Sequence, residues 1–210
     1  MGFFSNLFET GEEKTFAQTK GILRIAHKAN HSLKGIMKGN GSMAAIKRME
    51  KESSNEYFKT SHMIMSGAIA PNLIDNMIIM AGKEENIADS VFKLSRQVLR
   101  YKIRSKKVTK YVNTKLQEFN RLADSAITLL MEMHTAKSIT KMRALRHQIK
   151  AIENEGDEVR DLLLDYAYNA NVGFKGFYHI TDLAYIYDDI LDDCEDSSDI
   201  FISMVLTLAT

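Results

Sequence analysis

Apolar residues recur every three or four positions through almost the whole of this 210-residue chain. That spacing places them on one face of an α-helix. The chain has a single proline, Pro71, so it lacks the many turns that a β-sandwich needs. An all-α fold of six helices joined by short turns is therefore predicted. The expected helices cover about 12–37, 43–66, 73–104, 108–133, 139–168 and 177–208.

Three of these helices carry apolar stripes that predict a common core. Breaks in the pattern support the proposed boundaries, with Gly39–Ser42 typical of a helix stop followed by a serine N-cap and Asn169–Gly176 typical of a loop. The stripe residues are Ile22, Ile25, Ala26, Ala29, Leu33, Ile36 and Met37 in the first helix, Val108, Val112, Phe119, Leu122, Ala126 and Leu130 in the fourth, and Leu183, Tyr187, Ile190, Cys194 and Phe201 in the sixth.

A formal net charge of +1 hides opposite charges in the two halves of the chain. The segment Lys93–Lys110 holds eight Lys or Arg and no acid, whereas Thr181–Asp199 holds eight acids and no Lys or Arg. The basic run is interpreted as a solvated joint between the halves. Contact with an anionic membrane surface is the next interpretation, and nucleic acid is not expected as a partner, since no DNA-binding motif accompanies the run.

The single cysteine, Cys194, excludes an intramolecular disulfide and a Cys-based zinc cluster, which favours a cytoplasmic location. The opening Met1–Phe8 is too short for a signal sequence, and the apolar window His62–Gly82 is interrupted by polar residues. A soluble or peripheral protein is therefore expected. The apolar side chains Phe3, Phe4, Leu7 and Phe8 could cap the bundle, join subunits into a homo-oligomer or touch the inner face of a membrane.

The second and fifth predicted helices share a sequence pattern, as do the third and sixth. Residues 46–52 (IKRMEKE) match 149–155 (IKAIENE) at an offset of 103, and Asp75, Glu85, Asp89 and Ser90 fall on Asp182, Asp192, Asp196 and Ser197 at an offset of 107. A tandem duplication follows. The expected units are a three-helix repeat over 1–106 and a second over 107–210, packed as one compact unit.

Acids spaced four apart occur on two helices of each repeat, and this spacing places both on one face. If the helices are antiparallel, the pairs converge, and carboxylates that converge repel one another unless a proton or cation neutralises them. Oxygen donors of this kind suit Mg, Ca, Mn or Fe. The alternative is that these acids form only a solvated face. The pairs are Glu153 with Asp157 and Asp192 with Asp196 in the second repeat, and Glu50 with Ser54 and Glu85 with Asp89 in the first.

The duplicated E/D-x-x-x-D pattern resembles the PhoU family of phosphate-signalling proteins, and within it the accessory proteins encoded beside Pit-type phosphate transporters. The stretches that carry the resemblance are KEENIAD (Lys83–Asp89), IENEGD (Ile152–Asp157) and DDILDDCEDSSD (Asp188–Asp199), with the opening MGFFSNLF and the position of Pro71. The resemblance implies two three-helix bundles, surface metal clusters and a regulatory role exerted by contact with a phosphate transporter or its regulatory complex.

When the metal-binding motifs of the family are matched residue by residue to this sequence, the resemblance implies two metal sites that hold Fe, Zn, Mn, Mg or Ca. The first-repeat site departs from the family pattern at Ser54, so its occupancy is left open. A competing pair, Asp189 with Asp193, lies on the same helix as Asp192 and Asp196, and the sequence does not decide which pair faces the metal. The expected ligands are Glu153, Asp157, Asp192 and Asp196 in the second repeat, and Glu50, Glu85 and Asp89 in the first.

Two other functions are weighed against this one, and no enzyme is expected because no catalytic motif is found. A carboxylate-bridged di-metal oxidase needs two Glu-x-x-His motifs that point inward, which this chain lacks. A purely structural helical scaffold would bind no stoichiometric metal. His27 and His31 are four apart and could hold a metal, but they are interpreted as a surface pair because no Cys or carboxylate motif accompanies them.

Overall fold

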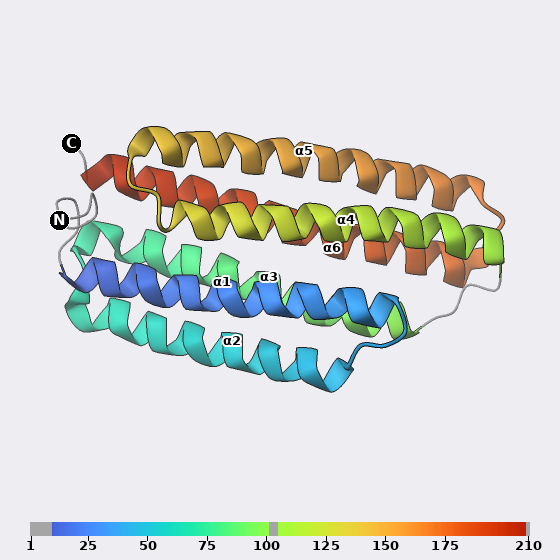
Figure 1. The fold of residues 1–210 in the computed structure, drawn as a ribbon, viewed down its shortest axis with the longest axis horizontal. Coiled ribbons are helices and arrows are strands. Elements are labelled where there is room, and N and C mark those ends of the chain that lie inside the picture. The colour runs from blue at the N-terminus through green and yellow to red at the C-terminus, as the bar shows by residue number, and fades with distance from the viewer. Residues whose placement is uncertain (1–9, 101–104, 209–210) are drawn as a thin grey trace.

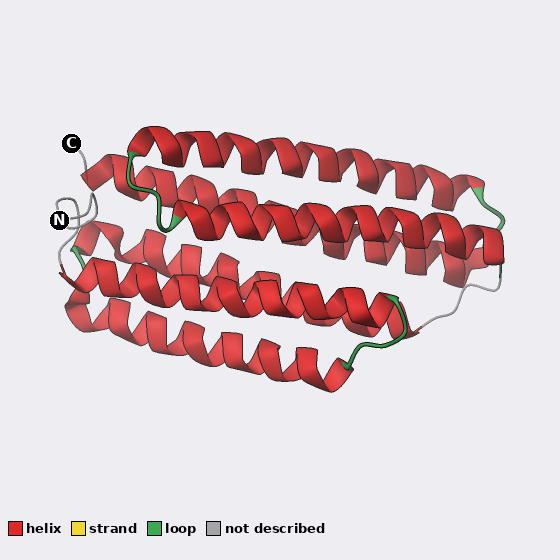
Figure 2. Ribbon diagram, viewed as in Figure 1, coloured by secondary structure: helices red, strands yellow, loops and turns green. Residues whose placement is uncertain are grey.

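The computed structural model describes residues 10–100 and 105–208, and within them every long element is an α-helix (Figures 1 and 2). The expected all-α fold of six helices is confirmed. A π-helical turn at Ile64–Ala68 and a 3-10 turn at Pro71–Leu73 connect the second helix to the third. The helices are α1 (Thr10–Met37), α2 (Met43–Met63), α3 (Ile74–Arg100), α4 (Lys106–Met133), α5 (Ile139–Asn169) and α6 (Gly173–Leu208).

Serine side chains cap the helices that follow turns. The hydroxyl of Ser42 accepts a hydrogen bond from the Ala45 amide, and Ser105 and Ser138 do the same for α4 and α5. These bonds satisfy amides that have no partner within the helix, which is why serine favours this position. Gly39, with φ of 81°, ends α1 in the left-handed region that glycine adopts without strain. The predicted stop at 39–42 is confirmed.

The α5–α6 connection is shorter than the sequence indicates. The prediction of a loop through Gly176 is wrong, because α6 begins at Gly173 rather than near residue 177. Gly173 has φ of 65°, which reverses the chain within three residues, and Gly176 is buried in the first turn of α6 against Val172. The α2 helix also ends three residues early, where the chain passes into the π-helical turn before Pro71.

The helices lie side by side as two groups of three, with α1–α3 in one group and α4–α6 in the other (Figure 1). Contacts between the groups join α3 to α6 and α1 to α4. The predicted stripes of α1, α4 and α6 are confirmed as core, since every residue of these stripes is buried except Met37, which is half-buried. The boundary of the repeats at 106/107 remains a prediction.

Two close contacts fix how the helices of the second group pack. The rings of Phe119 on α4 and Tyr187 on α6 are parallel within 2°, with centroids 5.1 Å apart, and both side chains are fully buried. Gly156 allows α5 to approach α6 closely, because a Cβ at that position would overlap the side chain of Leu191. The glycine of the IENEGD stretch thus brings the acids of α5 next to those of α6.

A buried polar cluster joins the two groups of helices. Glu84 of α3 is fully buried, and its Oε1 lies 2.8 Å from Nε2 of His134, the residue that ends α4. The Ser197 hydroxyl of α6 donates to the same carboxylate oxygen at 3.3 Å. Oε2 of Glu84 has no hydrogen-bond partner among the described residues. This Glu84–His134 pair therefore depends on both groups being packed together.

In the described part of the chain, none of the helices combines the length and the apolar character that crossing a bilayer would require. Phe3, Phe4, Leu7 and Phe8, together with Lys102 and Arg104 of the basic run, lie outside the described residues.

Candidate cation-binding site on α5 and α6

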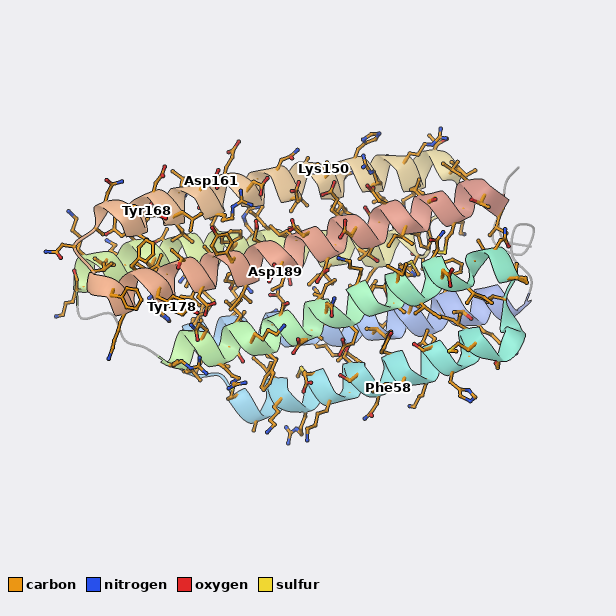
Figure 3. The ribbon with its side chains drawn as sticks, turned by 180° about the vertical axis from the view of Figure 1, so that it is seen from behind. Phe58, Lys150, Asp161, Tyr168, Tyr178 and Asp189 are labelled. Carbon is orange, nitrogen blue, oxygen red and sulfur yellow. The ribbon has the colours of Figure 1, made fainter. Side chains whose placement is uncertain are left out.

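The acids of α6 form two rows that face different helices. One row pairs with basic residues of α5, and the other pairs with Lys83 or lies beside Lys93 of α3. In Figure 3, Asp189 lies between α6 and α3, whereas Lys150 lies on α5. Adjacent residues on a helix are about 100° apart, so the two rows occupy neighbouring strips of one helix. The row that faces α5 contains Asp188, Asp192, Glu195 and Asp199, and the row that faces α3 contains Asp189, Asp193 and Asp196. Asp192 lies at the edge of its row, because it also lines a pocket with the three acids of the other row, Lys83 and Lys93.

Basic side chains of α5 neutralise most of the row that faces them. Lys150 Nζ lies 2.8 Å from Glu153 and 3.0 Å from Glu195. Arg160 lies 2.8 Å from Asp188 and also pairs with Asp157. At the other end of the row, Arg146 pairs with Asp199. Two of the predicted ligands, Glu153 and Asp157, thus lie on α5 beside α6, as expected, and each already contacts a basic side chain.

Asp192 is the member of this row without a basic partner among the described residues. Burial is the largest cause that raises the pKa of its carboxyl to about 6, and the negative charges of Asp188, Glu153 and Asp157 contribute to the same rise. These four residues, Glu153, Asp157, Asp188 and Asp192, are called the acidic cluster below. An added cation would relieve the repulsion among these carboxylates, which is the part of the shift that points to a cation site.

Asp196, the fourth predicted ligand, lines a pocket together with Asp192 but is held on the α3 side of α6. Its carboxylate lies 2.7 Å from Lys83 Nζ of α3, and Asp193 shares the same ammonium at 3.1 Å. Burial raises the pKa of Asp193 to about 6, while Lys83 acts in the opposite direction. The competing pair Asp189 and Asp193 therefore faces α3 together with Asp196. Asp192 lies between the two rows, because it lines a pocket with these three acids and is also close enough to Glu153 and Asp157 of α5 for their charges to raise its pKa.

The equivalent acids of the first repeat are held by other side chains. The Ser54 hydroxyl donates a hydrogen bond of 2.6 Å to Glu85, and Lys93 pairs with Asp89 at 2.8 Å. Glu50 is half-buried on α2 and makes no ion pair with a described residue. Serine in place of an acid at position 54 thus converts a repulsive contact into a hydrogen bond, so less negative charge is available to attract a cation.

The oxygen donors of the acidic cluster suit a hard cation, but their present rotamers hold basic side chains instead. Among the described residues, no group of three His, Cys, Asp or Glu side chains is arranged to ligate a metal. A metal bound here would need Arg160 to leave Asp157 and Asp188. Arg160 is about one-fifth exposed, so its long side chain is in contact with solvent. His27 pairs with Asp124 at 3.1 Å and does not join the cluster.

Replacing Asp192 with asparagine should raise the melting temperature of the metal-free protein at neutral pH. The folded-state pKa of about 6 lies above the usual value of 3.8, so ionisation of this carboxyl destabilises the fold as pH rises through 6. The difference in melting temperature between wild type and variant should vanish below the usual pKa, where Asp192 is protonated in both the folded and the unfolded protein. Thermal melts in a chelator from pH 4 to 8 test this. A variant that is less stable than wild type at neutral pH would contradict the claim that the ionised Asp192 carboxylate destabilises the fold.

Comparison with solved structures shows which known fold this is. Two crystal structures from Shewanella oneidensis MR-1, one described as a PhoU-like phosphate regulatory protein and one as a PhoU-like protein, each match with a TM-score of 0.62. Each match covers 94% of this chain and 98% of the other, at 10% sequence identity. No model of a known family and no curated protein matches the sequence. The chain therefore shares the fold of PhoU-like proteins.

Proposed function

We propose that this protein is an accessory regulator of phosphate transport that binds metal ions at the acidic cluster and acts by protein contact rather than by catalysis. The shared fold supports the regulatory role, because one of the similar structures is described as a phosphate regulatory protein. The observation that carries the cation site is Asp192, which has no basic partner among the described residues and whose pKa is raised by burial and by the carboxylates of Asp188, Glu153 and Asp157. The sequence resemblance further suggests a transporter of the Pit type.

The proposed primary ligands are Glu153, Asp157, Asp188 and Asp192, and the ion is Mg, Ca, Mn, Fe or Zn. When bound, such an ion would supply positive charge that Arg160 and Lys150 now provide in part. Ion binding would release these basic side chains, which changes the charge that the α5–α6 surface presents to a partner. The duplicated pattern suggests a second site at Glu50, Glu85 and Asp89. This site should be weaker, because the Ser54 hydroxyl already donates a hydrogen bond to Glu85.

The two alternatives receive less support from the described residues. A carboxylate-bridged di-metal oxidase needs two inward carboxylate–histidine motifs, and the buried Glu84 meets one histidine, His134, from another helix. A scaffold whose acids only aid solubility would have no reason to place Asp192 where burial and neighbouring carboxylates raise its pKa, at a cost in stability.

Deleting the gene in its host and measuring uptake of radioactive phosphate tests the proposed function. Deletion should change the uptake rate, and wild type or Glu158→Gln should restore it, because Glu158 is an exposed acid of α5 outside the cluster. The double variant Asp157→Asn, Asp192→Asn should fail to restore it. Unchanged uptake after deletion would contradict regulation of transport. Full restoration by the double variant would contradict a role for the cluster while leaving the regulatory role intact.

A further inference from the structure

Three aromatic side chains protrude into solvent where α5 ends and α6 begins. Phe174 is 83% exposed, Tyr168 75% and Tyr178 60%. Figure 3 shows Tyr168 and Tyr178 at the same end of the molecule. Phe174 and Tyr178 are four residues apart on α6, so they project from one face of that helix. Exposed rings gathered at one tip are uncommon on a surface that meets only water, and such patches mark interaction sites.

Neighbouring contacts hold this tip in place without covering the rings. Tyr168 packs edge-on against Phe177 with centroids 4.9 Å apart. Tyr111 of α4 stacks on Tyr166 of α5 at 4.0 Å, which ties the start of α4 to the end of α5. The rings that protrude are therefore carried on an ordered base of packed aromatics.

Exposed lysines lie at the same end of the bundle as the rings. Lys106, Lys107 and Lys110 lie on the first turns of α4, which begins at this end (Figure 1), and Lys175 follows Phe174 directly. All four are exposed, and none makes an ion pair with a described residue. The sequence has no Asp or Glu between Asp89 and Glu118, or between Asp165 and Asp182. The tip is thus basic as well as aromatic.

We propose that this tip, formed by Tyr168, Phe174, Lys175 and Tyr178 with Lys106, Lys107 and Lys110, binds the surface of an anionic lipid bilayer. Aromatic rings partition into the headgroup region of a bilayer, and lysines beside them are attracted to anionic headgroups. The acidic row of α6 lies further along the helix, away from the tip, so bound lipid would not meet it. A membrane is favoured over nucleic acid because the rings protrude into solvent at one end of the bundle, where they can enter a headgroup layer.

Flotation of the purified full-length protein with lipid vesicles tests this proposal. Vesicles of phosphatidylcholine mixed with phosphatidylserine are compared with vesicles of phosphatidylcholine alone, without metal or any partner protein. The test variants are Phe174→Ser with Tyr178→Ser, and Lys106→Gln with Lys107→Gln. Matched controls are Phe58→Ser, which removes a ring 67% exposed on α2, and Lys141→Gln with Arg143→Gln, which removes exposed charges at the opposite end of α5.

Wild type should float with the mixed vesicles and much less with phosphatidylcholine alone. Loss of the two rings should lower partitioning roughly tenfold, and each lysine removed should lower it about fivefold. Both controls should behave as wild type. The proposal is overturned if the ring variant floats normally, if the controls lose binding equally, or if a single-stranded oligonucleotide binds at the tip and displaces the vesicles. Because no transporter or metal is present, failure here leaves the proposed function untouched.

Discussion

Replacing His134 with leucine is expected to lower the free energy of unfolding by about 3–5 kcal/mol. His134 supplies the shortest hydrogen bond to Glu84, and both side chains are fully buried. Without the imidazole, Glu84 keeps only the Ser197 hydroxyl at 3.3 Å, so a carboxyl group is left in the interior with little compensation. Urea denaturation of the purified protein measures the loss.

Two further variants separate this cause from a general loss of packing. The double variant Glu84→Leu, His134→Leu removes both polar groups and should recover most of the lost stability, since replacing a buried pair with apolar residues is often neutral. The exposed His147→Leu of α5 should change stability by less than about 0.5 kcal/mol. If the double variant is less stable than His134→Leu alone, the explanation by an uncompensated carboxyl is wrong.

Replacing Phe119 with alanine should destabilise the protein by a similar amount, about 3–5 kcal/mol. The ring is fully buried between α4 and α6, and its parallel stack with Tyr187 is lost together with the apolar area. A cavity remains because α5 and α6 are already in close contact at Gly156 and cannot move together to fill it.

Chemical denaturation of Phe119→Ala is compared with Phe58→Ala, whose ring is 67% exposed. The exposed variant should fall within about 0.5 kcal/mol of wild type. A loss for Phe119→Ala as small as that of Phe58→Ala would show that the α4–α6 stack is not a main source of stability.

The helices and their buried faces follow from the sequence because helical periodicity is a local signal. The α6 stripe that includes Tyr187 and Phe201 is read correctly for that reason. The start of α6 is predicted wrongly, because Gly173 and Gly176 both suggest a loop. In the structure, Gly173 reverses the chain and Gly176 packs inside the first helical turn.

The candidate site is predicted in part, and its limits have a physical cause. Spacing places Glu153 and Asp157 on one face of α5. The structure agrees, because their partners Lys150 and Arg160 also pair with acids of α6. The four-residue spacing cannot decide whether Asp192 or Asp193 faces α5, because the rotation of α6 about its axis is set by long-range packing. Lys83 on α3 and Arg160 on α5 reveal which acids each helix meets.

The Glu84–His134 pair is missed for a related reason, since its two residues are 50 positions apart. One local signal could have indicated it. Glu84 occupies the core register of α3, between the buried residues Met80 and Ile87. An acid at such a position needs a buried partner, although periodicity does not name that partner.

Metal content of the purified protein, prepared without a histidine tag and measured by plasma mass spectrometry, tests the acidic cluster most directly. Wild type, Glu158→Gln and Asp196→Asn should carry near-stoichiometric metal, because Glu158 is exposed and Asp196 pairs with Lys83. Asp157→Asn and Asp192→Asn should lose it. Protein that is metal-free and cannot be reloaded, or metal that persists in both of these variants, would contradict the cation site.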